Sequence, residues 1–146
     1  MDKLKCKYIF FDLDGTLTES DPGITRSIKY ALEKHNIQSP PLEDLKIFVG
    51  PPLGEMFMEV FGFTKEQADE MVLTYRERYT TIGKFECNIY DGIGETLKKL
   101  KDMGKVLCVA TSKPENSARE VLEHFDLTKY FSVIVGSTLD GTLSKK

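Results

Sequence analysis

The segment from Tyr8 to Thr18 limits the fold and the chemistry of this chain more than any other. An apolar, aromatic-rich run ends there at Asp12-Leu13-Asp14-Gly15-Thr16. The run has the length and composition of a buried strand, and Gly15 predicts a turn directly after it. Open α/β folds place functional side chains where such strands end. The two carboxylates can attack an electrophile, bind a hard cation or do both, and the alternative is a solvated turn.

The composition is that of an ordinary domain with room for a small insertion. The chain has 146 residues, of which 40% are hydrophobic and 29% are charged. A formal net charge of −3 argues against general affinity for nucleic acid, although it leaves room for a small anionic substrate. No apolar run is long enough to span a membrane and no signal peptide precedes the first strand, so we expect a cytoplasmic protein. The cysteines (Cys6, Cys87 and Cys108) fit neither a disulfide framework nor a zinc cluster.

Helical patterns follow the first strand for about seventy residues. Asp21-Pro22 predicts a helix start, with Asp21 as the N-cap and Pro22 at the first helical position. Thr64 to Gln67 is a capping box, and it opens a helix that we expect to end at Gly83 with Ile82 on its buried face. The helix before it ends at Gly62, and its expected apolar face is Leu53, Met56, Phe57, Val60 and Phe61.

The remaining residues alternate between helix and strand, which is typical of a parallel sheet. We expect a helix ending at Gly104 with Met103 inward, a strand at 106–110, a polar turn at Thr111 to Pro114, a further helix, and a strand at 131–135. The chain is therefore predicted to have an α/β core, residues 1–17 and 88–146, with a helical domain inserted at 18–87.

Thr111-Ser112 follows its strand as Asp12 follows the first one. Parallel strands end at the same edge of a sheet, so Thr111 is expected to lie beside Asp12. A hydroxyl and free backbone N–H groups at the start of a helix suit a phosphate group, although simple helix capping explains the same residues. A phosphate pocket also needs a cation, which Lys145 or Lys146 would supply if this basic pair is more than a solvated tail.

These segments resemble the haloacid dehalogenase-like (HAD) hydrolase superfamily over essentially the whole chain. Asp12 to Thr16 is similar to its motif I, Thr111 to its motif II, and Leu139 to Lys146 to the approach to its motif III. The helical block resembles that superfamily's C1 cap, and Val49 to Leu53 resembles a segment of the phosphoglycolate phosphatase-like branch. The resemblance implies a Rossmann-like parallel sheet with an inserted helical cap.

The resemblance also implies roles for the residues that match the motifs. Asp12 would be the nucleophile that forms an aspartyl-phosphate, and Asp14 the general acid and base. Mg²⁺ would be held by the side chain of Asp12 and the backbone carbonyl of Asp14. The substrate's phosphoryl group would be bound by Thr16, Thr111, Ser112 and Lys146, with Lys145 as the second choice of lysine.

One departure from the superfamily pattern concerns a further metal-binding aspartate, which in the family follows motif III on a later strand. This sequence ends before that motif. We therefore expect the chain to be the N-terminal portion of a protein of about 200 residues or more, with the C-terminal part of the core missing. The alternative is a naturally short relative that is deficient in metal.

The leading functional hypothesis is a Mg²⁺-dependent phosphomonoesterase, monomeric or homodimeric, acting on a small metabolite such as phosphoglycolate, a nucleotide or pyrophosphate. A sugar phosphomutase is one alternative, and a catalytically deficient binding or regulatory protein is another. The substrate is not identified by the sequence. Arg26, Lys84 and the turn from Gly50 to Leu53 are candidate substrate contacts in the helical block.

Overall fold

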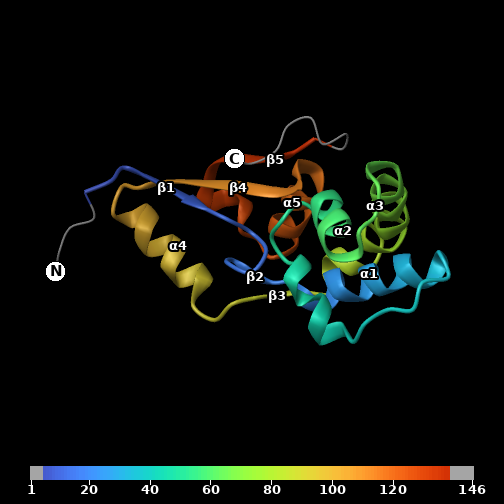
Figure 1. The fold of residues 1–146 in the computed structure, drawn as a ribbon. Coiled ribbons are helices and arrows are strands. Elements are labelled where there is room, and N and C mark those ends of the chain that lie inside the picture. The colour runs from blue at the N-terminus through green and yellow to red at the C-terminus, as the bar shows by residue number, and fades with distance from the viewer. Residues whose placement is uncertain (1–4, 139–146) are drawn as a thin grey trace. The chain divides into compact units, whose positions relative to one another are not determined.

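The computed structural model describes residues 5–138, and the chain divides into two compact units (Figure 1). The core unit is Met1–Thr18 with Ile89–Lys146, and the helical unit is Glu19–Asn88. The elements of the core unit are β1 (Tyr8–Phe11), α4 (Ile93–Asp102), β4 (Val106–Pro114), α5 (Glu115–His124), the 3₁₀ turn η3 (Thr128–Tyr130) and β5 (Phe131–Ser137). The elements of the helical unit are α1 (Asp21–Lys34), η1 (Leu42–Phe48), α2 (Leu53–Phe61), α3 (Lys65–Tyr79) and η2 (Gly83–Phe85). The short strands β2 (Thr18–Glu19) and β3 (Asn88–Ile89) pair with each other where the chain passes between the units.

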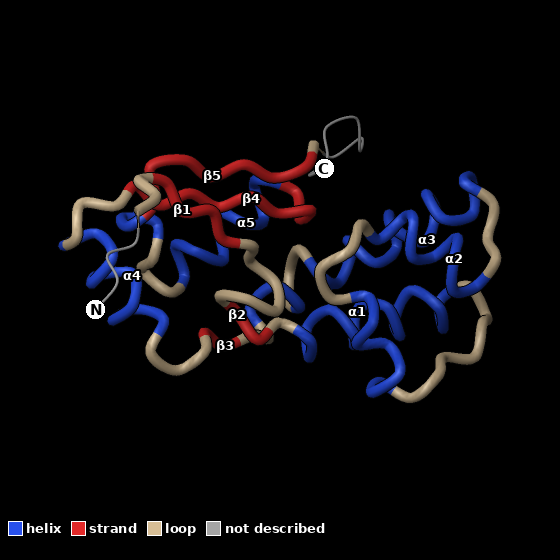
Figure 2. The backbone as a smooth tube through the Cα atoms, turned by 60° about the vertical axis from the view of Figure 1, so that its left-hand side comes forward, coloured by secondary structure: helices blue, strands red, loops and turns tan. Residues whose placement is uncertain are grey.

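The sheet of the core unit has the order β1-β4-β5, and both pairings are parallel (Figure 2). In the first pairing Tyr8 lies opposite Val106 and Phe11 lies opposite Val109. Parallel pairing requires a crossover between strands, and α5 supplies the one between β4 and β5. The predicted α/β fold with a parallel sheet and an inserted helical segment is thereby confirmed.

Helices α4 and α5 cover one face of this sheet (Figures 1 and 2). Leu97 of α4 and Leu122 of α5 are buried with Leu107, Val109 and Ile134 of the strands. The sheet's opposite face carries apolar side chains that remain exposed, and they are Tyr8, Phe10, Val133 and Val135. This period of two matches strand geometry, because successive side chains point to opposite faces.

The helical unit has an apolar core of its own. Phe48 and Phe57 are fully buried, and their rings lie 5.2 Å apart between centroids. The rings of Phe61 and Phe63 stack on each other with centroids 5.4 Å apart and pack against the same core. Ile28 and Leu32 of α1 are buried in this cluster. Each unit can therefore bury apolar surface internally, as a domain requires. Within residues 5–138, no helix combines the length and the apolar composition needed to cross a membrane.

Two predicted helix boundaries are confirmed by the backbone geometry. Thr64 Oγ1 accepts from the N–H of Gln67, and Gln67 Oε1 accepts from the N–H of Thr64, which is a complete capping box. Gly62 ends α2 in the left-handed conformation with φ of +68°.

Some predicted details of the helices are wrong. The N-cap of α1 is Ser20 and not Asp21, which is the first helical residue. Helix α3 ends at Tyr79, before Gly83, so Ile82 lies beyond the helical spacing that placed it inward and is exposed. Met103 is exposed for the same reason, since α4 ends at Asp102. Val60 is also exposed, because the apolar stripe of α2 is wider than the surface that the unit buries.

The predicted turn from Thr111 to Pro114 is instead the last part of β4. Pro114 pairs with Ser137 of β5 after a register shift that begins at Ala110, and α5 starts at Glu115. The strand continues because β5 still offers it a partner at this point. The hydroxyl of Thr111 is thus carried by an irregular strand end and not by a free turn.

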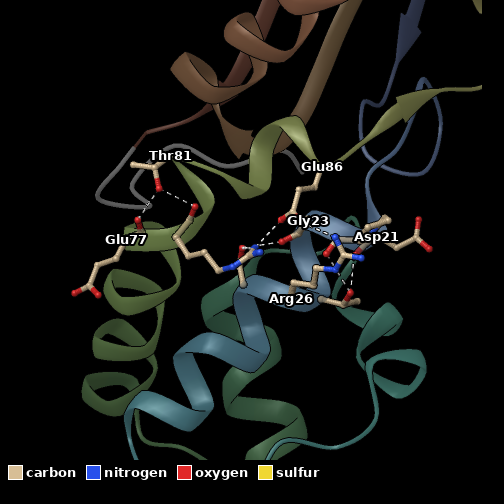
Figure 3. Close-up of polar contacts among 10 residues, drawn as sticks. Asp21, Gly23, Arg26, Glu77, Thr81 and Glu86 are labelled. Atoms are coloured by element: carbon tan, nitrogen blue, oxygen red, sulfur yellow. Dashed lines mark hydrogen bonds and ion pairs between the residues drawn. The ribbon is translucent and has the colours of Figure 1, made fainter.

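A cluster of charges ties the first and the last segment of the helical unit together (Figure 3). Glu86 accepts from Arg78 at 2.7 Å and from Arg26 at 2.6 Å, and its backbone carbonyl accepts from the N–H of Gly23 at 3.1 Å. Arg78 also donates to Ser27 Oγ at 3.2 Å. We call these residues the Glu86 cluster. Hydrogen bonds from Arg78, and then from Arg26, hold the pKa of Glu86 below its ordinary value of 4.5 against the opposing effect of burial.

We predict that Glu86→Gln destabilises the protein by about 1–3 kcal/mol at neutral pH, because two guanidinium groups lose their anionic partner. Since the pKa of Glu86 is lower in the folded state, its stabilisation is present above about 4.5 and is lost as the pH falls through the lower folded value. The difference between the variant and the wild type should therefore shrink in acid. Urea unfolding followed by circular dichroism at neutral and acidic pH measures it.

The matched control is Glu59→Gln, an exposed glutamate on α2, for which we expect less than about 0.5 kcal/mol at either pH. A Glu86→Gln variant as stable as this control at neutral pH would contradict the role of the cluster.

Candidate active site

The sheet register brings both predicted motifs to one edge of the core unit. Phe11 is the last residue of β1 and lies opposite Val109 of β4. Asp12 directly follows Phe11, and Thr111 lies two residues beyond Val109. Both motifs therefore follow the residues that pair β1 with β4, near the carboxyl end of these parallel strands, where ligands bind in open α/β sheets.

A tight loop fixes the backbone around the two aspartates. The carbonyl of Leu13 accepts hydrogen bonds from the N–H groups of Thr16, Leu17 and Thr18 at 3.2, 2.9 and 3.1 Å. Gly15 turns the chain with φ of +78°, and its N–H donates to the Thr18 carbonyl at 2.8 Å. The side chains of Leu13 and Leu17 are fully buried. The loop is thus anchored by apolar residues that alternate with its polar ones.

The two carboxylates differ in their surroundings. Asp12 is half-buried, and its Oδ1 accepts from the N–H of Leu13 at 2.8 Å. Asp14 forms an ion pair with Lys113, in which Nζ lies 3.4 Å from Oδ2. The side chain of Lys113 is only 5% exposed and that of Asp14 only 10%. An ion pair this well buried is rare, because desolvating each charge is costly.

Lys113 is the site residue that was not singled out from the sequence, which directed attention to the C-terminal lysines. The sequence does carry a signal for Lys113, because this lysine, like Thr111, lies in the turn predicted directly after the strand at 106–110. The backbone N–H of Lys113 donates to Thr111 Oγ1 at 3.1 Å, so the hydroxyl of Thr111 and the backbone of Lys113 belong to one local structure.

The predicted substrate-binding residues differ in their exposure to solvent. Thr111 is buried and Ser112 is half-buried at the end of β4, whereas Thr16 is exposed on the loop after β1. Lys145 and Lys146 fall outside the described residues. The structure thus brings Asp14 to the segment of Thr111, and the roles of all these residues in binding remain predictions.

Gly136 of β5 allows the end of β4 to come close. A Cβ atom added to Gly136 would clash with the carbonyl oxygen of Lys113 and lie 2.6 Å from the backbone nitrogen of Glu115. Neither atom can move without shifting the backbone. Gly136 therefore helps to set the position of the segment that carries Thr111 and Lys113.

The donor atoms of Asp12 and Asp14 suit a hard cation. Carboxylate and carbonyl oxygens are the ligands that Mg²⁺ prefers, and it usually uses one or two carboxylates together with substrate and water. Within residues 5–138, no group of three or more His, Cys, Asp or Glu side chains gathers as a metal cluster. The oxygen ligands of Asp12 and Asp14 fit a magnesium ion that takes its remaining ligands from other groups.

The candidate substrate contacts in the helical unit have structural roles. Arg26 pairs with Glu86, and the Lys84 ammonium lies 5.0 Å from the centroid of the Phe85 ring. Gly50 has φ of +106°, so the turn from Gly50 to Leu53 depends on a glycine. Their part in substrate selection stays a prediction.

Comparison with known proteins agrees with this arrangement. A family model described as "Haloacid dehalogenase-like hydrolase" matches residues 9–143. The chain is similar to a predicted phosphatase from Clostridium acetobutylicum of known crystal structure, with 51% identity and a TM-score of 0.93. That match covers 94% of this chain and 64% of the other.

Curated relatives carry several names. A 5′-nucleotidase of Pseudomonas aeruginosa is 47% identical, with 98% of this chain and 65% of the relative covered. The tyrosine-protein kinase PtkA of Mycobacterium tuberculosis is 39% identical over 94% of this chain and 47% of its own length. A phosphoglycolate phosphatase of Haemophilus influenzae is 31% identical over 89% of this chain and 62% of the relative. The chain therefore spans less than two thirds of each of these relatives.

We predict that Gly136→Ala destabilises the protein by about 1–3 kcal/mol, because its Cβ would press on the backbone at Lys113 and Glu115. Gly94→Ala is the matched control in the same unit, since an added Cβ there meets nothing within 4 Å. Gly94 lies in α4, so alanine should be neutral or stabilising by up to about 1 kcal/mol. Urea unfolding of both variants tests this, and equal stability would show that β5 does not restrain the end of β4.

Proposed function

Since the chain belongs to the haloacid dehalogenase-like hydrolase family, we propose that the protein is a Mg²⁺-dependent phosphomonoesterase acting on a small phosphorylated metabolite. The observation that carries the proposal is the placement of Asp12 and Asp14, which follow β1, at the same edge of the sheet as Thr111 of β4. Relatives named 5′-nucleotidase and phosphoglycolate phosphatase support a phosphate monoester of a small alcohol as the substrate.

In the first half of the reaction, a carboxylate oxygen of Asp12 forms a bond to phosphorus while the bond from phosphorus to the leaving oxygen breaks. Asp14 gives its proton to that oxygen, and the alcohol departs. The phosphoryl group is now an aspartyl-phosphate on Asp12. Thr111 and Ser112 bind the phosphoryl oxygens throughout, by hydroxyl and backbone N–H donors.

In the second half, Asp14 takes a proton from water, and the water oxygen attacks phosphorus. The bond between phosphorus and Asp12 breaks, which frees inorganic phosphate and returns Asp12 to its carboxylate form. The side chain of Asp12 and the backbone carbonyl of Asp14 would hold Mg²⁺. Bound Mg²⁺ supplies charge screening, so that an anionic nucleophile and an anionic substrate can approach each other.

Other features of the protein belong to the same proposal. The helical unit acts as a cap that limits access of water and selects the substrate. The protein is cytoplasmic, functions as a monomer or a homodimer, and has neither nucleic acid nor membrane as a partner.

We predict that Asp12→Asn lowers phosphate release from phosphoglycolate or adenosine 5′-monophosphate by at least about a thousandfold, because an amide cannot replace the carboxylate nucleophile. The assay uses the full-length gene product with Mg²⁺ and measures inorganic phosphate. Asp102→Asn, an exposed aspartate at the end of α4, is the control and should leave the rate unchanged.

Three outcomes would contradict the proposal. Activity that survives Asp12→Asn would exclude Asp12 as the nucleophile. Transfer of the phosphoryl group to a second hydroxyl, on a sugar or on protein, would indicate a mutase or a kinase. Tight phosphate binding without turnover in the wild type would indicate a binding or regulatory protein.

A further inference from the structure

Lys113 has a buried side chain whose charge the proposed reaction does not use. We propose that Lys113 is a positioning residue, which holds the carboxylate of Asp14 in the orientation required for proton transfer to the leaving oxygen. This inference rests on the proposed function, since it assigns Asp14 the role of general acid and base.

The contact that supports the proposal is buried on both sides. Lys113 Nζ lies 3.4 Å from Asp14 Oδ2, with the side chains 5% and 10% exposed. Lys98 and Asp102 of α4 form a pair of nearly the same length, 3.3 Å, but their side chains are 70% and 67% exposed. Water competes for the exposed pair at every moment. The buried pair has little such competition, so it can restrain the rotation of Asp14.

The backbone of Lys113 is itself fixed, which positioning requires. Its N–H donates to Thr111 Oγ1 at 3.1 Å, and its carbonyl oxygen lies against Gly136. Lys113 also lies on β4, the central strand of the sheet. A cation on such a rigid element can hold a carboxylate on the loop after β1, which is how a supporting residue makes a catalytic group precise.

Correct placement of a general acid matters most where the leaving oxygen needs a proton. An alkyl phosphate such as phosphoglycolate or adenosine 5′-monophosphate has a poor leaving group, and its oxygen must be protonated as the bond breaks. p-Nitrophenyl phosphate has a good leaving group that departs as an anion. A residue that positions Asp14 should therefore affect the first class of substrate and spare the second.

The experiment compares Lys113→Met with the wild type in the full-length, Mg²⁺-containing protein on both classes of substrate. We expect kcat for the alkyl phosphate to fall about tenfold to a hundredfold with little change in KM, and kcat for p-nitrophenyl phosphate to change less than about threefold. In an Asp14→Asn background, Lys113→Met should have no further effect on either substrate. Lys98→Met is the matched control and should change neither rate.

A second measurement needs no activity and no metal. Asp14→Asn and Lys113→Met should each lower the urea midpoint of the protein in EDTA, because each removes one side of a buried ion pair. The double variant should recover part of the loss. The exposed pair of Lys98 and Asp102 should show no such coupling.

Equal losses on both classes of substrate, or a raised KM as the main effect, would overturn the proposal and indicate that Lys113 binds the phosphoryl group. Additive midpoint changes for Asp14→Asn and Lys113→Met would overturn it as well. If Lys113→Met alone does not fold, the double variant and Asp14→Asn supply the comparison, and equal rates in those two on both substrates are expected. A wild type that hydrolyses neither substrate would refute the proposed function. If the wild type is active but Lys113→Met affects both classes of substrate equally, only the role of Lys113 is refuted.

Discussion

The parallel pairing of β1 with β4 is the interaction on which the rest of the structure depends. It sets Phe11 opposite Val109 although about a hundred residues separate them in the sequence. Because the pairing is parallel, the residues that follow the paired segments emerge at one edge, where Asp14 meets Lys113. A shift of one residue would exchange the two faces of β1 and would expose Ile9 and Phe11 in place of Tyr8 and Phe10. The apolar core of the unit thus enforces the register that builds the candidate site.

The same edge contains a charge pair that stability alone does not explain. Burying Lys113 and Asp14 costs desolvation energy that their attraction only partly recovers, and apolar side chains of similar volume are often as stable in such positions. Gly136 adds a second constraint, because the close approach of β5 excludes even a Cβ atom there. These two local features at one edge of the sheet support the proposed function, since functional sites are where local rules of stability are broken.

Much of the fold and the shared sheet edge of the candidate site were predictable from the sequence, and the family resemblance based on the motifs is confirmed. Thr64 and Gln67 predict their helix start because a capping box is a local interaction between near neighbours. The predictions that are wrong concern residues whose positions are not set by their near neighbours in the sequence. Pro114 stays in β4 because Ser137 pairs with it, and Ile82 is exposed because α3 ends at Tyr79. Lys113 was missed because an ion pair between residues 14 and 113 leaves no periodic pattern in the chain.

The helical unit can interrupt the core because its two ends are held together. The chain leaves the core after Thr18 and returns at Ile89, and in an unfolded loop of this length the entropy of closure would oppose the pairing of β1 with β4. The Glu86 cluster joins the start of α1 to the last segment of the unit, through Arg26, Arg78 and the N–H of Gly23. Close approach there again requires glycine, since a Cβ on Gly23 would clash with the carbonyl oxygen of Gly83. With its ends fixed and its own phenylalanine core, the unit closes the loop as a folded body, which lowers the entropic cost of pairing β1 with β4.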